Sequence, residues 1–244
     1  MRLAIMQPYF FPYPGYFSLI KHTDKFIILD MVQFIRHGWI ERNRILKQDS
    51  GWLYVKVPLT RKEGRDTLIK DLRIDNTQDW KQRIMAQLQT YRKIAPYYNQ
   101  VRTILEEIFS IDYEDIVQLD KRTMEAVCDY LGITHDIQVF SEMGLQINTP
   151  AAPDEWALNI ALSLGGVKEY WNPPGGRSFF DGQKYREAGI DLKFLELRPA
   201  SYNQHRDSFE SGLSIIDALM FNSVQQVREI LDDFIIHDSC RVDL

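Results

Sequence analysis

The chain has little cysteine and no long apolar segment. Of its 244 residues only Cys128 and Cys240 are cysteines. They lie far apart, without a C-x-x-C pair or neighbouring histidines, which excludes a disulfide framework and a zinc motif. Lys, Asp or Gln interrupts every apolar stretch, so none reaches the roughly 20 residues of a membrane span. With no leading signal peptide, the sequence predicts a reduced, cytoplasmic protein that does not insert into membranes.

An excess of positive charge is absent as well. The chain has 29 Lys and Arg against 34 Asp and Glu, for a net charge of -5, and neither sign forms a long run. Nonspecific nucleic-acid binding is therefore not expected, although a local basic pocket is compatible with this balance. With 45% hydrophobic residues the chain can bury the core of one large domain.

The hydrophobic pattern predicts an α/β protein. Two short apolar runs, residues 2–7 and 25–30, flank an amphipathic stretch at 15–22. Such continuous apolar runs are typical of buried parallel strands. Residues 42–59 predict a hairpin that turns at 49–51, and residues 68–75 predict one more short strand.

Residues 76–135 change to helical periodicity, and strands and helices alternate again after them. We expect strands at 136–140, 168–172 and 191–197 and helices near 156–164, 183–188 and after 211–214. The sequence thus predicts a single α/β domain over residues 1–244. Its sheet is Rossmann-like and mostly parallel, and residues 76–135 form a helical insertion between two sheet-forming halves.

The loop after the first predicted strand, "QPYFFPYPGY", is rich in proline and aromatic residues. Ligands of open α/β sheets bind beyond the carboxyl ends of the strands, where this loop lies. Prolines fix its backbone, and aromatic rings offer flat faces to a base or a sugar. The alternative is a rigid cover whose rings pack on the core. We expect substrate contacts from Gln7, Tyr9, Tyr13 and Tyr16.

The second predicted strand ends in "LDMVQFIRHGWIERNRI", which is dense in polar side chains. In a βαβ unit this end lies beside the first loop. Asp30 can serve as a general base or hold a ribose hydroxyl, His37 can titrate, and Asn43 can orient the substrate. Arg42 can clamp a phosphate or carboxylate. We predict Asp30, His37 and Asn43 as catalytic and Gln33, Trp39 and Arg42 as substrate-binding. The alternative places His37 in an exposed loop and Arg42, with Arg44, on a solvated strand face.

Two later loops have similar chemistry. "NPPGG" follows the strand at 168–172, and its glycines allow close backbone approach and can donate N-H groups to an anion. "SYNQHRD" has the density of hydrogen-bonding groups that suits a polyhydroxylated ligand. A plain turn and a solvent-facing loop are the respective alternatives. The substrate-binding residues predicted here are Asn172, Gly175, Gly176, Tyr202, Gln204 and Asp217.

Five segments together resemble the WbqC-like family: "QPYFFPYPGYFSLI", "DKFIILDMVQFIRHGWIERNRI", "YRKIAPYY", "KEYWNPPGG" and "SYNQHRDSFESGLSIIDALMFNS". The resemblance implies cytosolic sugar-nucleotide or glycan-precursor chemistry, because members are encoded among bacterial genes for surface polysaccharide and amino-sugar synthesis. The motif positions it implies are Gln7, Pro8, Pro12, Gly15, Asp30, Gln33, Trp39, Asn43, Tyr202, Gln204, Ser214 and Asp217. Met31 departs from the acidic residue expected beside Asp30, so no metal site is predicted there.

Three functions are compatible with these residues. The leading hypothesis is a transferase that attaches an acyl or aminoacyl group to the amine of a nucleotide-linked amino sugar in surface-polysaccharide (O-antigen) synthesis. No nucleophile triad is evident, which favours direct transfer from an activated donor, and no other cofactor is expected. The second is a nucleotide-dependent activating enzyme. The opening is distantly similar to nucleotidylyltransferases, but "PYPGYFSLI" lacks their histidines. The third is a non-catalytic partner in a glycan-assembly complex.

Overall fold

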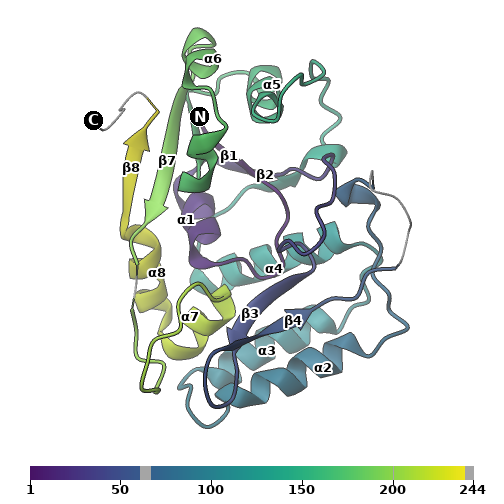
Figure 1. Ribbon diagram of the computed structural model, residues 1–244, viewed down its shortest axis with the longest axis vertical. Coiled ribbons are helices and arrows are strands. Elements are labelled where there is room, and N and C mark those ends of the chain that lie inside the picture. The colour runs from purple at the N-terminus through teal and green to yellow at the C-terminus, as the bar shows by residue number, and fades with distance from the viewer. Residues whose placement is uncertain (61–66, 200, 240–244) are drawn as a thin grey trace.

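The computed structural model describes residues 1–60, 67–199 and 201–239, and its centre is a six-stranded sheet with helices on both faces (Figure 1). The polar, basic stretch at 61–66 and Cys240 lie outside these residues. Cys128 is buried. Within the described ranges, no helix is long and apolar enough to cross a membrane.

The sheet has the strand order β5-β2-β1-β6-β7-β8. Its strands are β1 (Arg2–Met6), β2 (Lys25–Ile28), β5 (Ile137–Val139), β6 (Glu169–Asn172), β7 (Asp191–Leu197) and β8 (Phe234–Asp238). The first five strands in this order are parallel, and β8 runs antiparallel to β7. The chain builds outward from β1 in one direction and then, from β6, in the other. The predicted Rossmann-like, mostly parallel α/β class is confirmed.

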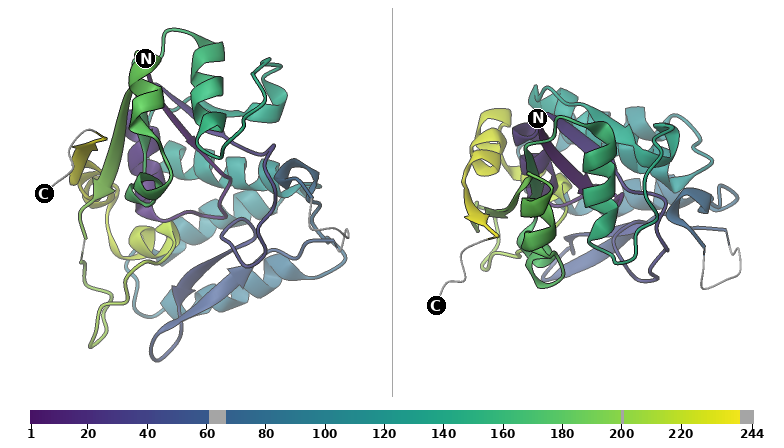
Figure 2. Two further views of the ribbon diagram at one scale, coloured as in Figure 1. Left: turned by 45° about the horizontal axis from the view of Figure 1, so that its top comes forward. Right: turned by 90° about the horizontal axis from the view of Figure 1, so that it is seen from above.

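Alternate residues of each strand enter two separate cores. Leu3 and Ile5 pack with α5 (Glu155–Leu164) and α6 (Gly182–Glu187). Ala4, on the opposite face, packs with α1 (Pro14–His22), α4 (Ile116–Leu131) and α8 (Val224–Asp232). The result is a three-layer arrangement (Figure 2). Burial on both faces explains why these strands are apolar throughout.

A second, smaller sheet lies beyond the carboxyl ends of the main strands. It is the predicted hairpin, β3 (Arg42–Leu46) paired with β4 (Trp52–Lys56). It packs with α2 (Trp80–Gln87), the 3-10 turn η2 (Leu88–Tyr91) and α7 (Ile215–Phe221). Helix α3 (Tyr98–Phe109) packs on α4 and α7. All of α2, α3 and α4 lie between β2 and β5, in the stretch predicted as an insertion.

The strand predicted at residues 68–75 is wrong. The chain there forms a 3-10 turn, η1 (Ile69–Asp71), and makes only isolated bridges, Gln33 with Leu68, Leu59 with Ile74 and Arg73 with Asp115. Each bridge joins a different segment, so no partner strand continues the pairing. The elements expected from the sequence do not include α8 and β8, and β8 forms one edge of the sheet.

Candidate functional site

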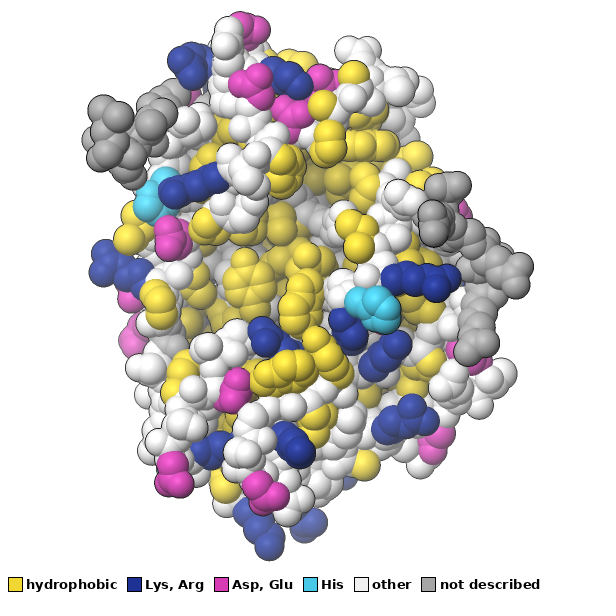
Figure 3. Space-filling model, viewed as in Figure 1, with side chains coloured by type: hydrophobic (Ala, Val, Ile, Leu, Met, Phe, Trp, Pro, Cys, Tyr) yellow, Lys and Arg dark blue, Asp and Glu magenta, His cyan; other side chains and the backbone are white. Residues whose placement is uncertain are grey.

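A cavity of about 900 Å³ opens where β1, β2 and β6 end. Figure 3 shows the apolar hollow on this face of the molecule. It lies where the strand order reverses between β1 and β6, the place where open α/β sheets bind ligands. Three predicted loops line it, and they bring together eight of the predicted residues: Gln7, Tyr9, Tyr13, Tyr16, Gln33, Asn172, Gly175 and Gly176.

The first loop divides its aromatic rings between the core and the cavity. Phe10 and Phe11 are buried in the core, while Tyr9 stacks on Tyr16 with ring centres 4.9 Å apart and both line the cavity. Both interpretations of this loop therefore hold in part. Its glycine has a steric cause, because a Cβ on Gly15 would lie 2.3 Å from the ring of Tyr13.

The cavity lining is uncharged. Among the described residues it holds no Asp, Glu, Lys, Arg or His. Burial raises the pKa of Tyr13 to about 12. It also raises the pKa of Tyr9 and, more strongly, that of Tyr16. All three phenols therefore stay protonated at neutral pH and act as hydrogen-bonding groups rather than as charges.

Two amides offer polar contacts in this neutral setting. Gln7 lies directly after β1, where the Tyr16 hydroxyl donates to its backbone carbonyl at 3.1 Å. Its side-chain amide makes no hydrogen bond within the described part of the chain and is open to a ligand. Asn172 donates to the Tyr170 hydroxyl at 2.9 Å. A Cβ on Gly176 would lie 2.4 Å from the Asn172 Oδ1 atom, so this position also requires glycine.

Two of the predicted catalytic residues are buried outside the cavity lining. Asp30 accepts hydrogen bonds from the backbone N-H of Ser141, at 3.0 Å, and from its hydroxyl. Asn43 donates to the carbonyls of Phe10 at 3.1 Å and Phe11 at 2.9 Å. Asp30 thus ties the loop after β2 to the chain after β5, and Asn43 ties the first loop to the hairpin.

The third predicted catalytic residue, His37, is exposed in a turn at the cavity mouth. Ile35, which lines the cavity, accepts a hydrogen bond from the Gly38 N-H. The Arg42 guanidinium donates to the carbonyls of His37 and Gly38. It also lies over the Tyr54 ring, 4.3 Å from its centre. The predicted Arg42 therefore holds this turn in place.

The remaining residue of that cluster, Trp39, packs beside the hairpin rather than in the cavity. The guanidinium of Arg44 lies 5.2 Å from the ring centre of Trp39 and 5.1 Å from that of Trp52. The Trp39 carbonyl accepts from the Phe10 N-H at 3.0 Å. Trp39 thus links the first loop to the hairpin.

The fourth predicted loop forms a separate network. Asp217 is fully buried and accepts from Tyr202 and Gln204, each at 2.7 Å, and from Tyr91 at 2.8 Å. Burial raises the pKa of Asp217, although the three donors act in the opposite direction. None of these residues lines the cavity. The network connects this loop to the 3-10 turn after α2.

Among the described residues, three that are not glycine have positive φ angles, and each lies in one of the predicted loops. They are Phe11 at 41°, His37 at 67° and His205 at 52°. Such conformations cost on the order of 1 kcal/mol or more and persist where surrounding contacts impose them. Ser214 and Asn43 both donate to the Phe11 carbonyl, and Arg42 donates to that of His37. Strain of this kind concentrates at functional sites.

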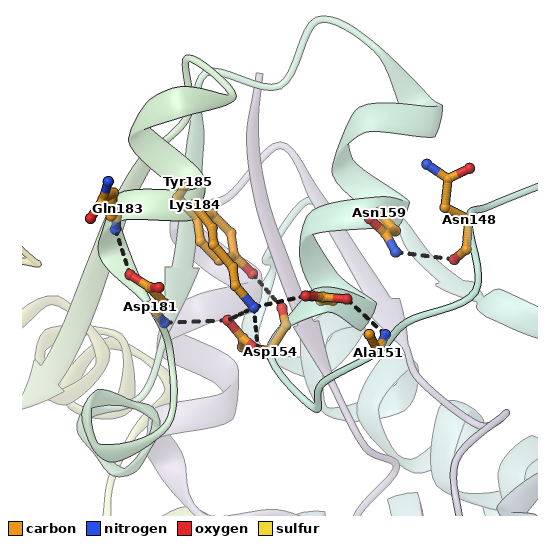
Figure 4. A network of polar contacts seen from close by, with 9 residues as sticks. Asn148, Ala151, Asp154, Asn159, Asp181, Gln183, Lys184 and Tyr185 are labelled. Atoms are coloured by element: carbon orange, nitrogen blue, oxygen red, sulfur yellow. Dashed lines mark hydrogen bonds and ion pairs between the residues drawn. The ribbon is translucent and has the colours of Figure 1, made fainter.

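Sequence reasoning missed one wall of the cavity, the segment 150–156. Pro150, Pro153 and Trp156 line it. Ion pairs and hydrogen bonds to α6 hold this segment, with the Tyr185 hydroxyl donating to the Asp154 carbonyl at 3.0 Å (Figure 4). The signal was available, because the loop that follows β5, a parallel strand, must begin at the same edge of the sheet.

Comparison with known proteins gives a family but no activity. The sequence model of the WbqC-like protein family matches residues 7–229. A protein of Mycobacterium tuberculosis (strain ATCC 25618 / H37Rv), named "Uncharacterized protein Rv1507c", is 29% identical over 223 residues, which cover 91% of this chain and 93% of that protein. No solved structure matches the chain. Among the described residues, no group of three or more His, Cys, Asp or Glu side chains could hold a metal ion.

Proposed function

The chain belongs to the WbqC-like family, and on that premise we propose that its cavity binds a nucleotide-linked amino sugar and that the protein transfers an acyl or aminoacyl group to the sugar amine. The observation that carries the proposal is the convergence of the loops after β1, β2 and β6 on one neutral, aromatic cavity. Flat rings suit a sugar or base face, and a few amides suit hydroxyl groups.

The neutral lining favours the reactive form of an amine. An ammonium group that enters a cavity without a carboxylate loses hydration and gains no counter-charge, so its pKa falls. The free amine, which carries the nucleophilic lone pair, is then stable at neutral pH. Desolvation thereby reduces the need for a carboxylate that removes a proton from the amine. Asp30 was predicted for that role, but it is buried and does not line the cavity.

The transfer itself is a direct acyl substitution. The amine nitrogen attacks the carbonyl carbon of an activated ester or thioester, and a carbon-nitrogen bond forms. The carbon-oxygen or carbon-sulfur bond of the donor then breaks, and the leaving alcohol or thiol takes the electron pair and one proton. The nitrogen loses one proton in return, for which exposed His37 at the mouth is a suitable acceptor.

Within this scheme each cavity residue has a physical role. The open amide of Gln7 can donate to a sugar hydroxyl or to the oxyanion that forms during transfer. The Tyr9 and Tyr13 rings provide stacking faces. Asp30 and Asn43 act as positioning residues, because they fix the loops that carry these groups and do not line the cavity.

The test compares ligands that differ only at the amine. Isothermal calorimetry would use a nucleotide-linked amino sugar, its N-acyl form and the matching sugar with a hydroxyl group in place of the amine. We expect the amino sugar to bind, Gln7→Ala to weaken binding about tenfold, and mass spectrometry to show acyl addition when an activated donor is present. Gln225→Ala, on the exposed surface of α8, is the matched control. No binding by a folded protein would overturn the proposal.

One observation favours a second candidate, a sugar-nucleotide binding protein without chemistry. Asp30 and Asn43, two of the three predicted catalytic residues, are anchored in separate hydrogen-bond networks. Binding of the amino sugar with no turnover of any acyl donor would select this candidate. Hydrolysis of ATP, or exchange of pyrophosphate into it, would instead select the activating enzyme.

A further inference from the structure

Four basic side chains beside the cavity lack acidic partners. They are Arg36, His37, Arg42 and Lys56, which we call the basic hairpin surface. Within the described residues, none of the four forms an ion pair with a carboxylate, although thirteen such pairs occur elsewhere. Figure 3 shows a group of Lys and Arg side chains around a His beside the apolar hollow. Charge that has no acidic partner among the described residues is available to an anion.

The hairpin register brings two of these charges face to face. Arg42 and Lys56 are directly opposed across β3 and β4. Opposed residues of an antiparallel pair extend from the same face, and like charges in such a pair destabilise the sheet. The repulsion between Arg42 and Lys56 destabilises the free protein. An anion bound between the two cations would replace this repulsion with a net attraction.

Arg44, the other arginine of the strand, is used differently. Its guanidinium lies between the rings of Trp39 and Trp52 and donates to the Gly212 carbonyl at 2.7 Å. Arg44 therefore fastens the hairpin to the chain before α7. This use leaves Arg36 and Lys56 as the outward cations, with Arg42 held against the turn beside them.

The turn at residues 35–38 connects this surface to the cavity. Ile35 lines the cavity, and Arg42 holds the carbonyls of His37 and Gly38. His37 adopts a φ of 67°, a conformation that persists where surrounding contacts hold it, and Arg42 holds its carbonyl. The turn is thus a fixed bridge between a neutral cavity and a basic surface.

A nucleotide-linked sugar needs both environments. Its base and sugars are neutral or nearly so, whereas its diphosphate carries negative charges that the cavity lining cannot neutralise. We propose that the basic hairpin surface binds the diphosphate while the cavity holds the uncharged part of the same ligand. This inference rests on the proposed function for the identity of the ligand, but the anion site itself is independent of it.

The experiment measures how the affinity depends on phosphate. Calorimetry would compare inorganic diphosphate, a nucleoside diphosphate sugar and the corresponding nucleoside without phosphate. We expect the double variant Arg36→Gln/Lys56→Gln to bind both phosphate-containing ligands about tenfold more weakly and the nucleoside within twofold of the parent. High salt should weaken parent binding more than variant binding. Both side chains are exposed and make no hydrogen bond in the described part of the chain, so the variant should fold.

The control is Lys168→Gln, an exposed lysine just before β6, at the opposite end of the sheet. It should keep the parent affinity for all three ligands. If the sugar nucleotide binds and the double variant keeps that affinity, the anion site is overturned and the proposed function stands. If only inorganic diphosphate binds, and the double variant weakens it, the anion site stands and the proposed function falls. Failure of the parent to bind either would overturn both.

Discussion

The two sides of the cavity treat charge in opposite ways. Behind the wall at residues 150–156, Lys184 of α6 reaches Glu155 at 2.8 Å and Asp154 at 3.4 Å, and Asp154 also accepts from the Asp181 N-H (Figure 4). On the hairpin side, Arg42 and Lys56 face one another with no carboxylate partner in the described residues. Both sides are polar in composition, yet only the first satisfies its charges internally.

This difference distinguishes charged side chains that stabilise the fold from charged side chains that are free to bind a ligand. Paired charges hold the wall segment in place and neutralise each other, so they do not attract a charged ligand. Unpaired like charges, in contrast, lower the stability of the free protein. A protein keeps such a cost where a bound group supplies the missing charge. Substitutions on the two sides should therefore affect different quantities.

The largest effect is expected from removing the paired acid. Asp154→Ala removes the acceptor of the Asp181 N-H and one of the two carboxylate partners of Lys184, and Asp154 is only 4% exposed. We expect the free energy of unfolding to fall by about 2 kcal/mol, measured by urea denaturation, because the hydrogen bond and the ion pair to a buried carboxylate are lost. Binding of inorganic diphosphate should not change.

The control for this prediction is Glu106→Ala, which removes the partner of Arg102 in an exposed helical pair. Its effect should stay below about 0.5 kcal/mol. The distinction between the two sides would fail if Asp154→Ala weakened diphosphate binding while leaving stability intact.

A buried acid pair, Asp120 and Glu41, sharpens the comparison, because three of its four carboxylate oxygens lack hydrogen-bond partners within the described residues. Both carboxylate oxygens of Asp120 on α4 lack hydrogen-bond partners within the described residues, as does one oxygen of Glu41. Burial, with the nearby charge of Glu41, raises the pKa of Asp120 well above its ordinary value. The folded protein therefore keeps a proton that the unfolded chain releases, so stability falls as pH rises from about 3.8 upward.

Asp120→Asn should remove this dependence. An amide stays neutral at every pH and can donate to Glu41, so we expect the variant to be more stable than the parent by about 1 kcal/mol at neutral pH. The advantage should shrink as the pH falls toward and below about 3.8, because the unfolded parent chain then also takes up a proton at this carboxyl. Melting temperatures of both proteins across this range would test it. Asp129→Asn, on the exposed face of the same helix, should show no such trend. An advantage that persists undiminished at low pH would contradict the role of the proton.

The sequence predicted the site where topology determines position. Parallel strands place their carboxyl ends at one edge, so Gln7, Gln33 and Asn172 could be brought together before the structure was known. The strand order, with β6 beside β1, follows from no local pattern, yet it sets the centre of the cavity. The neutral lining was likewise not predictable, because which side chains face inward depends on packing.

The roles of individual polar residues were harder to predict than their location. Asp30 and Asn43 have the same chemistry as ligand-binding residues, but both are used to fasten loops. A carboxylate or amide at a strand end serves either purpose, and the choice depends on a distant donor or acceptor such as Ser141. Tyr202, Gln204 and Asp217 illustrate the same limit, because their network joins segments far apart in the sequence.

The smallest predicted effect gives the most direct test of the comparison. The same change, lysine to glutamine, should raise the stability of the protein on one side of the cavity and lower it on the other. Lys56→Gln relieves the repulsion with Arg42, so we expect the free protein to gain about 0.5 kcal/mol of stability. Lys184→Gln removes the partner of Asp154 and Glu155 and should lower stability. Denaturation at low salt would measure both, and high salt should reduce both differences. If both variants shift stability in the same direction, the Arg42 and Lys56 charges are already neutralised in the free protein. The argument that these charges are available to bind an anion is then wrong.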